Sequence, residues 1–365
     1  MKLAFISPLP PDHTGVADYS AGLLEALREH AQVEVVTAPH GGYDNYIYQV
    51  GNNPLHLPAY RGALARPGVT VLHDAVLHHL LLGVLSEAEY VAEFVYNYGG
   101  WMRQLAGEMW RSRSRSASDA RYFHYPMLRR VVESSRRVVV HNPGARRMVE
   151  QAVPGARVTE IPHYFVTPKL PGQAAQTRED LGVEAHELLV AAFGYLRESK
   201  RLRSVLLALR GVPRTRFLLV GEFVSPELEE SLAPLLEEAC VIRRPHVPEA
   251  EFWRLAEAVD VCVNLRDPSA GETSGIGIRL MGIGKPVIVT ASEENAGYPE
   301  TAVIRVDPGE PEADMLACYL AALAGSPEMR ETIGRHAAEH IASEHSLERA
   351  ARRYLELAAE GCRLP

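Results

Sequence analysis

The sequence contains few cysteines and no long hydrophobic run. Among its 365 residues are four cysteines, none of them in a C-x-x-C pair: Cys240, Cys262, Cys318 and Cys362. This spacing does not match the C-x-x-C motifs of metal sites and redox proteins. It indicates reduced, structural thiols. No apolar stretch reaches the roughly 18 residues of a membrane span, and the apolar run before Pro8 is too short for a signal peptide. We therefore expect a cytoplasmic protein.

Other absences disfavour several classes of protein. The G-x-G-x-x-G dinucleotide fingerprint is missing, because Leu280 stands where a third glycine would follow Gly275 and Gly277. The Gly284-Lys285 pair lacks the upstream glycine and the following Ser/Thr of a P-loop, and no G-x-S-x-G nucleophile elbow occurs. The formal net charge of −8 does not favour a general nucleic-acid binder. An NAD-dependent oxidoreductase and a nucleic-acid-binding protein are therefore weak hypotheses.

The chain does contain a regular alternation of short apolar runs with amphipathic helices. Such alternation implies parallel sheets with right-handed crossovers, and 365 residues favour two domains. We expect an α/β fold of two doubly wound, Rossmann-like parallel-sheet domains. Ligands of such sheets bind at the carboxyl ends of the strands, so the two sets of strand-end loops are expected to face one cleft.

The expected elements follow from apolar periodicity and from turn residues. Strands are expected at residues 3–6, 33–37, 69–73, 138–140, 158–161, 188–193, 217–220, 241–243, 261–265, 287–290 and 303–306. Helices are expected at residues 16–29, 199–209, 226–239, 249–258 and 274–284, and three more close the chain, the last near 346–360.

Composition shifts set the expected domain boundaries. Residues 168–178 are rich in Pro, Gly, Gln and Ala, which is typical of a linker. We therefore predict an N-terminal domain over residues 1–167, with a helical insertion at about 86–135. A C-terminal domain is predicted over residues 179–345, followed by a C-terminal helix within 346–365.

The loop after the strand at 261–265 carries the sharpest functional signal. It contains the sequence Gly-Glu-Thr-Ser-Gly at positions 271–275 and opens a helix. Small residues let backbone N–H groups approach a ligand, and a helix N-terminus favours an anion such as phosphate. The Glu272 carboxylate suits sugar hydroxyl groups instead. The pair of features indicates a nucleotide-sugar; the alternative is an ordinary capped helix with a glycine-rich entry.

Three further segments follow expected strands. Arg197, Lys200 and Arg201 lie near a helix start, where the helix dipole disfavours cations. Their presence indicates an anion bound nearby; the alternative is solvated surface charge. Gly15 ends the first strand-to-helix loop and leaves room for a diphosphate, or else belongs to a rigid turn. His73 ends a strand and would hydrogen-bond a sugar hydroxyl or steer a proton, or else is a packed core residue. No recognisable metal-ligand spacing occurs.

The segment at 86–135 combines nine aromatic residues with seven arginines. Aromatic rings stack on sugars and arginine pairs with phosphate, so about 90–130 is the expected acceptor side. A second interpretation is peripheral contact with an anionic membrane on its cytoplasmic face. A third is a helical insertion with solvated arginines.

These segments, in this order, resemble the retaining glycosyltransferases of family 4, the group 1 transferases of GT-B fold. The likeness runs over nearly the whole chain. Its landmarks are the Pro-x-Pro…Gly-Val-Ala-Asp-Tyr-Ser loop, His73-Asp74, Gly194…Lys200, and Gly-Glu-Thr-Ser-Gly…Gly-Lys-Pro-Val, the last being the most specific.

The resemblance implies a role for each site residue. Arg197 and Lys200 would hold the donor diphosphate, Glu272 would bind the donor sugar, Gly15 would touch the diphosphate, and His73 would lie near the reacting sugar. Backbone N–H groups would complete the diphosphate site: Thr273, Ser274, Gly275 and Ile276. The C-terminal helix would pack on the N-terminal domain.

One position departs from the family pattern. The second glutamate of the family's paired-glutamate motif usually binds ribose, and its place falls on Arg279, in a stretch one residue short. This leaves ribose recognition and the nucleotide open, without implying loss of activity.

The expected function is a metal-independent, cofactor-free retaining transfer of a sugar from a nucleotide-diphosphate donor. The acceptor would be a glycan, a lipid-linked sugar or a small molecule, in cell-envelope polysaccharide synthesis. The alternatives are a non-catalytic nucleotide-sugar-binding partner and a sugar-nucleotide epimerase of the same fold.

Overall fold

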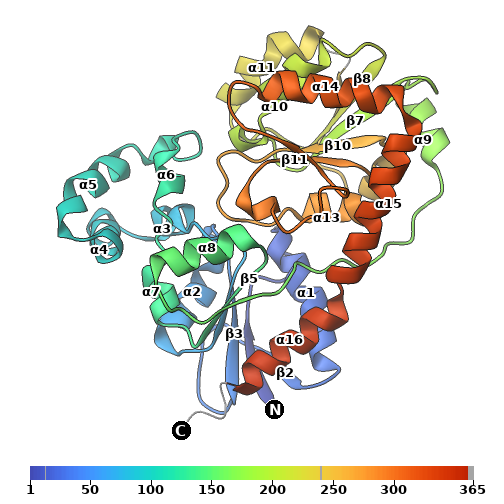
Figure 1. Ribbon diagram of the computed structural model, residues 1–365. Coiled ribbons are helices and arrows are strands. Elements are labelled where there is room, and N and C mark those ends of the chain that lie inside the picture. Colours follow the sequence, from blue (N-terminus) through green and yellow to red (C-terminus); the bar gives the residue numbers. More distant parts are fainter. Residues whose placement is uncertain (13, 239–240, 361–365) are drawn as a thin grey trace. The chain divides into compact units, whose positions relative to one another are not determined.

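The computed structural model describes residues 1–12, 14–238 and 241–360 (Figure 1). The chain forms two compact units. Unit 1 comprises Met1–Tyr164, Pro268–Thr273 and His345–Pro365, and unit 2 comprises Phe165–Asp267 and Ser274–Glu344. Cys240, Cys362, the expected helix end at 239 and residues 361–365 of the predicted C-terminal segment lie outside the described residues.

Unit 1 is built on a parallel sheet of order β2-β1-β3-β4-β5-β6. Its strands are β1 (Lys2–Ile6), β2 (Gln32–Val35), β3 (Asn45–Val50), β4 (Val69–Leu72), β5 (Arg137–Val140) and β6 (Val158–Glu160). The strand order reverses at β1, which pairs with β2 on one edge and β3 on the other. In doubly wound sheets ligands bind beyond the carboxyl ends of the strands at such a reversal.

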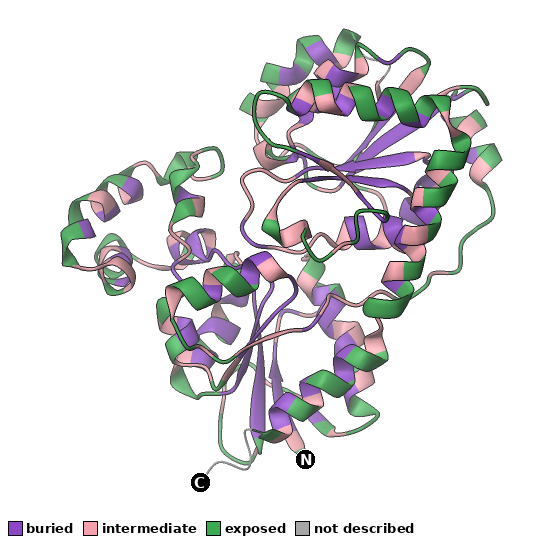
Figure 2. Ribbon diagram, in the orientation of Figure 1, coloured by how far each residue is buried: buried purple, intermediate pink, exposed green. Residues whose placement is uncertain are grey.

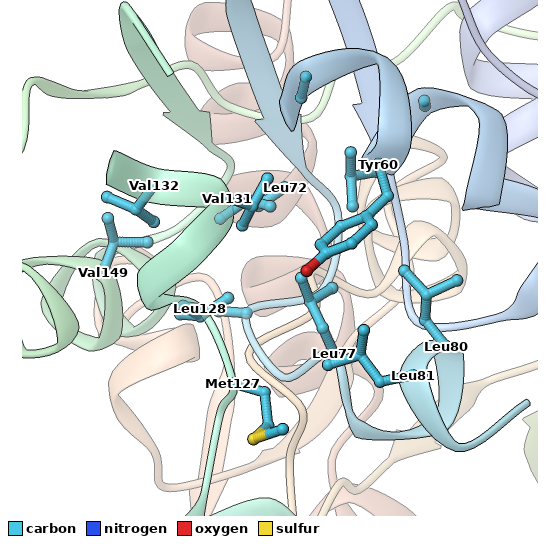
Figure 3. Packing of buried hydrophobic residues seen from close by; sticks show 14 of the residues in the cluster. Tyr60, Leu72, Leu77, Leu80, Leu81, Met127, Leu128, Val131, Val132 and Val149 are labelled. Carbon is cyan, nitrogen blue, oxygen red and sulfur yellow. The ribbon is translucent and has the colours of Figure 1, made fainter. Parts of the chain in front are cut away.

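Helices cover both faces of this sheet. One face packs on α1 (Gly15–Arg28) and α16 (Leu347–Glu360). The other packs on α2 (Leu57–Ala65), α3 (His78–Val84), α7 (Arg129–Glu133) and α8 (Pro143–Ala152). Figure 3 shows the core of the second face, with these side chains labelled: Tyr60, Leu72, Leu77, Leu80, Leu81, Met127, Leu128, Val131, Val132 and Val149. This core fixes α3 against the sheet.

Residues 86–135 form a helical segment on unit 1. It contains α4 (Glu87–Tyr98), α5 (Arg103–Arg111) and α6 (Arg121–His124), which lie to one side of the sheet in Figure 1, and α7. A capping box starts α4, because the Ser86 hydroxyl and the Glu89 carboxylate each accept from the other's backbone N–H. Of its nine aromatic residues, Tyr96 and Trp101 are exposed, whereas three are buried in the core of unit 1: Tyr90, Phe94 and Tyr122. These three are therefore not available to stack on a sugar.

Unit 2 contains a second parallel sheet, of order β12-β11-β10-β7-β8-β9. Its strands are β7 (Leu188–Phe193), β8 (Thr215–Val220), β9 (Val241–Arg244), β10 (Val261–Asn264), β11 (Val287–Thr290) and β12 (Ile304–Val306). Helices α10 (Leu202–Leu209), α11 (Pro226–Glu238) and α14 (Glu312–Gly325) cover one face. Helices α12 (Glu249–Ala258), α13 (Gly275–Gly282) and α15 (Pro327–Glu344) cover the other. Figure 2 shows the central strands of both sheets as buried.

The expected α/β class of two doubly wound parallel sheets is confirmed. Three expectations need correction. No strand was expected at β3, whose buried side chains include Asn45 and Gln49 beside tyrosines rather than an aliphatic run. The expected linker holds the start of α9 (Ala174–Asp180). The helix expected at 199–209 begins as α10 at Leu202, after a separate 3-10 turn. Among the described residues, no helix has the length and apolar content needed to span a membrane.

Candidate functional site

The topology of unit 2 by itself points to one edge of its sheet. Counted from β7, the strand order is 3-2-1-4-5-6, so the order reverses between β7 and β10. The carboxyl ends of these two strands are where a doubly wound sheet binds its ligand. The loop beginning at Gly194 follows β7, and the loop beginning at Leu265 follows β10. The loop that carries the cations and the glycine-rich loop before α13 therefore both begin at this reversal.

Lys200 lies within this edge. Its side chain is buried, although lysine is almost never buried unless its charge is compensated. Burial raises the pKa of the Cys262 thiol on β10 to about 12, and the nearby Lys200 charge acts in the opposite direction. Ser199 O accepts from Asp267 N–H at 2.9 Å, which ties the turn before α10 to the end of β10. Arg197 is exposed, with its guanidinium carbon 5.6 Å from the Tyr195 ring centroid.

Arg201, the third cation of this segment, has a structural role. It is a non-glycine residue at φ 56°, immediately before α10. Its guanidinium pairs with Glu312 at 2.9 Å, and the Glu312 side chain is only 1% exposed. The pair compensates a buried carboxylate, so Arg201 needs no bound anion to explain it. Of the three cations in this segment, Arg197 and Lys200 therefore remain the candidates to bind an anion.

The first turn of α13 faces the Gly194 loop. Ser274 is the N-cap of α13 and accepts from Gly277 N–H at 3.2 Å, and its hydroxyl donates to Asn264 Oδ1 at 3.2 Å. Gly194 has φ 87°, and a Cβ built there would lie 4.0 Å from Ile276 Cγ1. The structure thus brings Ser274, Gly275 and Ile276 next to the loop that carries the two cations.

Arg266 adds a cation that the sequence analysis did not single out. It lies two residues after the end of β10 and is half-buried, and its Nη2 lies 3.4 Å from the Ser274 hydroxyl at the start of α13. Positive charge at a helix N-terminus is unfavourable unless an anion is near. The available signal was a charged residue immediately after a buried strand. We call Arg197, Lys200, Arg266 and the first turn of α13 at 274–276 the phosphate cradle.

Arg279, at the place of the family's second glutamate, packs on α12. Its guanidinium carbon lies 4.6 Å from the ring centroids of both Phe252 and Trp253, and it forms an ion pair with Glu249. Arginine at position 279 is therefore explained by its role in packing α13 against α12.

Arg279→Ala is therefore expected to lower the free energy of unfolding by about 1 kcal/mol, the scale of an exposed cation–π contact and a surface ion pair. Nucleotide-sugar binding is expected to change by less than about twofold. Urea unfolding and a binding titration check both points, with the exposed Arg203→Ala as the charge-matched control. Loss of nucleotide binding with unchanged stability would contradict this assignment.

Glu272 and Thr273 lie on a loop that belongs to unit 1. Glu272 Oε2 accepts from Ala270 N–H at 2.8 Å, so this carboxylate folds back onto its own loop. The Asn142 amide donates to Gly271 O at 3.0 Å and to the Thr273 hydroxyl at 2.9 Å. A carboxylate has about four lone-pair directions, so Glu272 retains acceptor capacity for a sugar hydroxyl. Asn142, which follows β5, is a positioning residue that the sequence analysis missed.

His73 lies in a buried cluster of histidines and tyrosines in unit 1. Its Nδ1 is 3.2 Å from His141 Nε2, and its Nε2 is 2.7 Å from the Gln49 side-chain oxygen. Burial is the main cause that lowers the pKa of His73 well below its usual value and the pKa of His141 to about 4. Both rings are therefore neutral at pH 7.

The neutral forms fix the direction of these hydrogen bonds. His141 Nδ1 donates to Ile161 O at 2.8 Å, so His141 Nε2 accepts from His73 Nδ1. His73 Nε2 must then accept a hydrogen bond, which requires the Gln49 amide to turn its NH2 group toward the ring. That orientation also gives Gln49 Nε2 a partner, which it otherwise lacks among the described residues. Both ring nitrogens of His73 are thus engaged within unit 1.

Gly15 is the first residue of α1. No protein atom of the described residues lies within 4 Å of a Cβ built there, and its φ does not demand glycine. Neither packing nor backbone conformation therefore explains a glycine here. Its predicted contact with a diphosphate stays a prediction.

The described residues contain no group of three or more His, Cys, Asp or Glu side chains arranged to hold a metal ion.

Solved structures share this fold at low sequence identity. Sucrose-phosphate synthase of Thermosynechococcus elongatus has a TM-score of 0.69 at 16% identity, covering 98% of this chain and 98% of that one. HepE of Anabaena in complex with UDP has a TM-score of 0.69 at 18% identity, covering 99% and 100%. WaaG, a glycosyltransferase involved in lipopolysaccharide biosynthesis, has a TM-score of 0.64 at 16% identity, covering 96% and 99%.

No protein-family model and no curated protein sequence matches this chain. At these identities the structural likeness establishes the fold alone. With its two six-stranded parallel sheets, each covered by helices on both faces, the chain has the GT-B fold that these solved structures also adopt.

Proposed function

We propose that this chain is a retaining glycosyltransferase that transfers a hexosyl or related group from a nucleotide-diphosphate sugar. The acceptor is a glycan, a lipid-linked sugar or a small molecule, and no metal takes part. The solved HepE structures contain UDP, UDP with glucose, or UDP-glucose, which supports a nucleotide-sugar donor for this chain.

The observation that carries the proposal is the phosphate cradle at the topological reversal of unit 2. Lys200 lies in the loop that follows β7, and Arg266 lies near the start of the loop that follows β10. The N-terminus of α13 opens beside these loops. A diphosphate has the charge that this arrangement favours, because fixed cations and a helix dipole stabilise phosphate oxygens. The two loops come together only because β7 and β10 are neighbours in the sheet.

The proposed reaction uses this positive charge in the transition state. The bond between the anomeric carbon and the β-phosphate oxygen breaks, and its electron pair goes to the diphosphate. Arg197, Lys200 and the α13 N-terminus stabilise that developing charge without reorganising, which is the largest single contribution in many enzymes. The acceptor oxygen attacks the same face of the sugar, and its proton passes to a phosphate oxygen of the leaving group. Glu272 positions the sugar.

A thermal-shift panel of nucleotide-diphosphate sugars tests this proposal. One nucleotide class should raise the unfolding midpoint, because a ligand at about 100 times its Kd adds about 2.7 kcal/mol of apparent stability. Lys200→Ala should reduce the shift. Slow release of the nucleoside diphosphate from the same donor would exclude a purely non-catalytic binding partner, and sugar interconversion without an acceptor would indicate an epimerase. No shift with any nucleotide-sugar would remove the proposal.

A further inference from the structure

A pocket of about 580 Å³ lies in unit 1, between α3 and the end of α5 with the turn that follows it. Its polar lining consists of His79, Arg111, Arg113, Ser114 and Ser116. No carboxylate is among the described residues that line it. We call it the arginine pocket.

The two arginines of this pocket are not neutralised by acidic side chains. Arg111 is exposed and has no hydrogen-bond or ion-pair partner in the described part of the chain. Arg113 donates one nitrogen to Trp110 O at 2.9 Å and stacks 4.4 Å from the Trp110 ring centroid. A guanidinium has five N–H donors, so this contact leaves Arg113 able to bind an anion. Two like charges on one pocket repel until an anion offsets them.

Three other arginines of the same segment are compensated by carboxylates. Arg121 pairs with Asp119, Arg129 with Glu133 and Arg130 with Glu93. The pocket arginines differ from these three in having no carboxylate partner among the described residues.

The hydroxyl groups of the pocket fit the same ligand. The Ser114 and Ser116 side chains make no hydrogen bond to any described residue. Two guanidinium groups and two hydroxyl donors match a doubly charged group with several acceptor oxygens, such as a phosphate ester. A single carboxylate would satisfy only one bidentate guanidinium.

The pocket is tied to the ligand edge of the unit 1 sheet. Asn52, which follows β3, accepts from His79 N–H at 2.8 Å and from Leu80 N–H at 3.1 Å at the start of α3. Asn52 N–H in turn donates to Asp74, which follows β4, at 2.8 Å. These bonds fix α3 to the carboxyl ends of β3 and β4, the edge at which doubly wound sheets bind ligands.

We propose that the arginine pocket binds a phosphate ester carried by the acceptor substrate. This inference rests on the proposed function, because it assigns the pocket to the acceptor of that reaction. The phosphate belongs either to a soluble sugar phosphate or to a lipid headgroup, and both present the same oxygens to Arg111 and Arg113.

The proposal is tested by measuring the binding of glycerol 3-phosphate, in the presence of excess UDP, from the broadening of its 31P NMR line. Arg111→Ala is expected to weaken binding about fivefold and the Arg111→Ala, Arg113→Ala pair about tenfold or more. Arg103→Ala, an exposed arginine at the start of the same helix, should stay within about twofold. Equal affinity in the double variant, or an equal loss in Arg103→Ala, would overturn the proposal. Arg111→Ala keeps the test valid if loss of the Arg113–Trp110 contact unfolds the segment.

A second arm distinguishes the source of the phosphate. Vesicles of phosphatidylcholine with phosphatidic acid are compared with phosphatidylcholine alone, using the same variants. If binding to the soluble ester or to the vesicles depends on the two arginines, the proposal is supported, and the arm that shows it identifies the source of the phosphate. If binding depends on the arginines in neither arm, the proposal is overturned. The nucleotide-sugar thermal shift is measured in parallel and should survive in the double variant. Phosphate binding without any nucleotide-sugar shift would therefore refute the proposed function and leave the pocket standing.

Discussion

Replacing Lys200 by alanine is expected to lower the rate of sugar transfer by about 100-fold or more. This is the scale of losing one preorganised charge donor that stabilises a developing oxyanion. Lys200 is buried beside β10, so its ammonium acts in surroundings with little water, where electrostatic stabilisation is strong. The measurement is release of nucleoside diphosphate from the donor that gives the largest thermal shift. Arg197→Ala is expected to act in the same direction.

Arg203→Ala is the matched control for this prediction. Arg203 is an exposed cation on the first turn of α10, three residues beyond Lys200, and lies outside the phosphate cradle. Its removal should change the rate by less than about twofold. Comparable rates in Lys200→Ala and wild type, with both proteins folded by circular dichroism, would show that the cradle does not hold the leaving group.

Acidification is expected to destabilise unit 1 strongly between pH 6.5 and pH 4. Burial is the main cause that lowers the pKa of His78 and His141 to about 4 and that of His163 to about 3. Below about pH 6.5 these histidines become protonated in the unfolded chain but stay neutral in the folded protein. The free energy of unfolding therefore falls as the pH falls. Each ring then lowers stability by about 2 kcal/mol at pH 5. The sum approaches the whole stability of a typical domain, about 5–15 kcal/mol.

Urea unfolding at a series of pH values measures this effect. Above about pH 7.5 the histidines are neutral in both states, so their contribution to the slope of stability against pH should vanish. Replacing His163 by glutamine should make the slope below pH 6.5 shallower by about 1.4 kcal/mol per pH unit, whatever it does to stability at pH 7. A flat profile from pH 7 to pH 5 would show that these rings are already solvated or protonated in the folded protein.

Several parts of the site were predictable because they depend on short-range patterns. A buried apolar run followed by glycine and polar residues indicates a strand end, whatever the rest of the chain does. This rule placed Gly194 at a strand end, and Lys200 and the start of α13 in or after the loops that follow β7 and β10. The same rule would have found Arg266 and Asn142, each two residues after the end of a buried strand.

Other parts were not predictable because partners distant in sequence decide them. β3 carries polar side chains that are buried only because distant groups pair with them, as Asn45 does with Ala358 O at 2.8 Å. The roles of Arg197, Lys200 and Arg201 look alike in the sequence. Only Glu312, more than a hundred residues away, shows that Arg201 is structural.

The sequence by itself determined the α/β class, the alternation of elements and the strand-end loops, because periodicity and turn chemistry act over a few residues. The tertiary structure alone decided which strands are neighbours, and so which loops meet. Strand order placed β7 beside β10, and ion pairs between distant residues showed that Arg130 and Arg201 are compensated. The physical reason is that charge and burial depend on what surrounds a side chain in space, which local sequence does not specify.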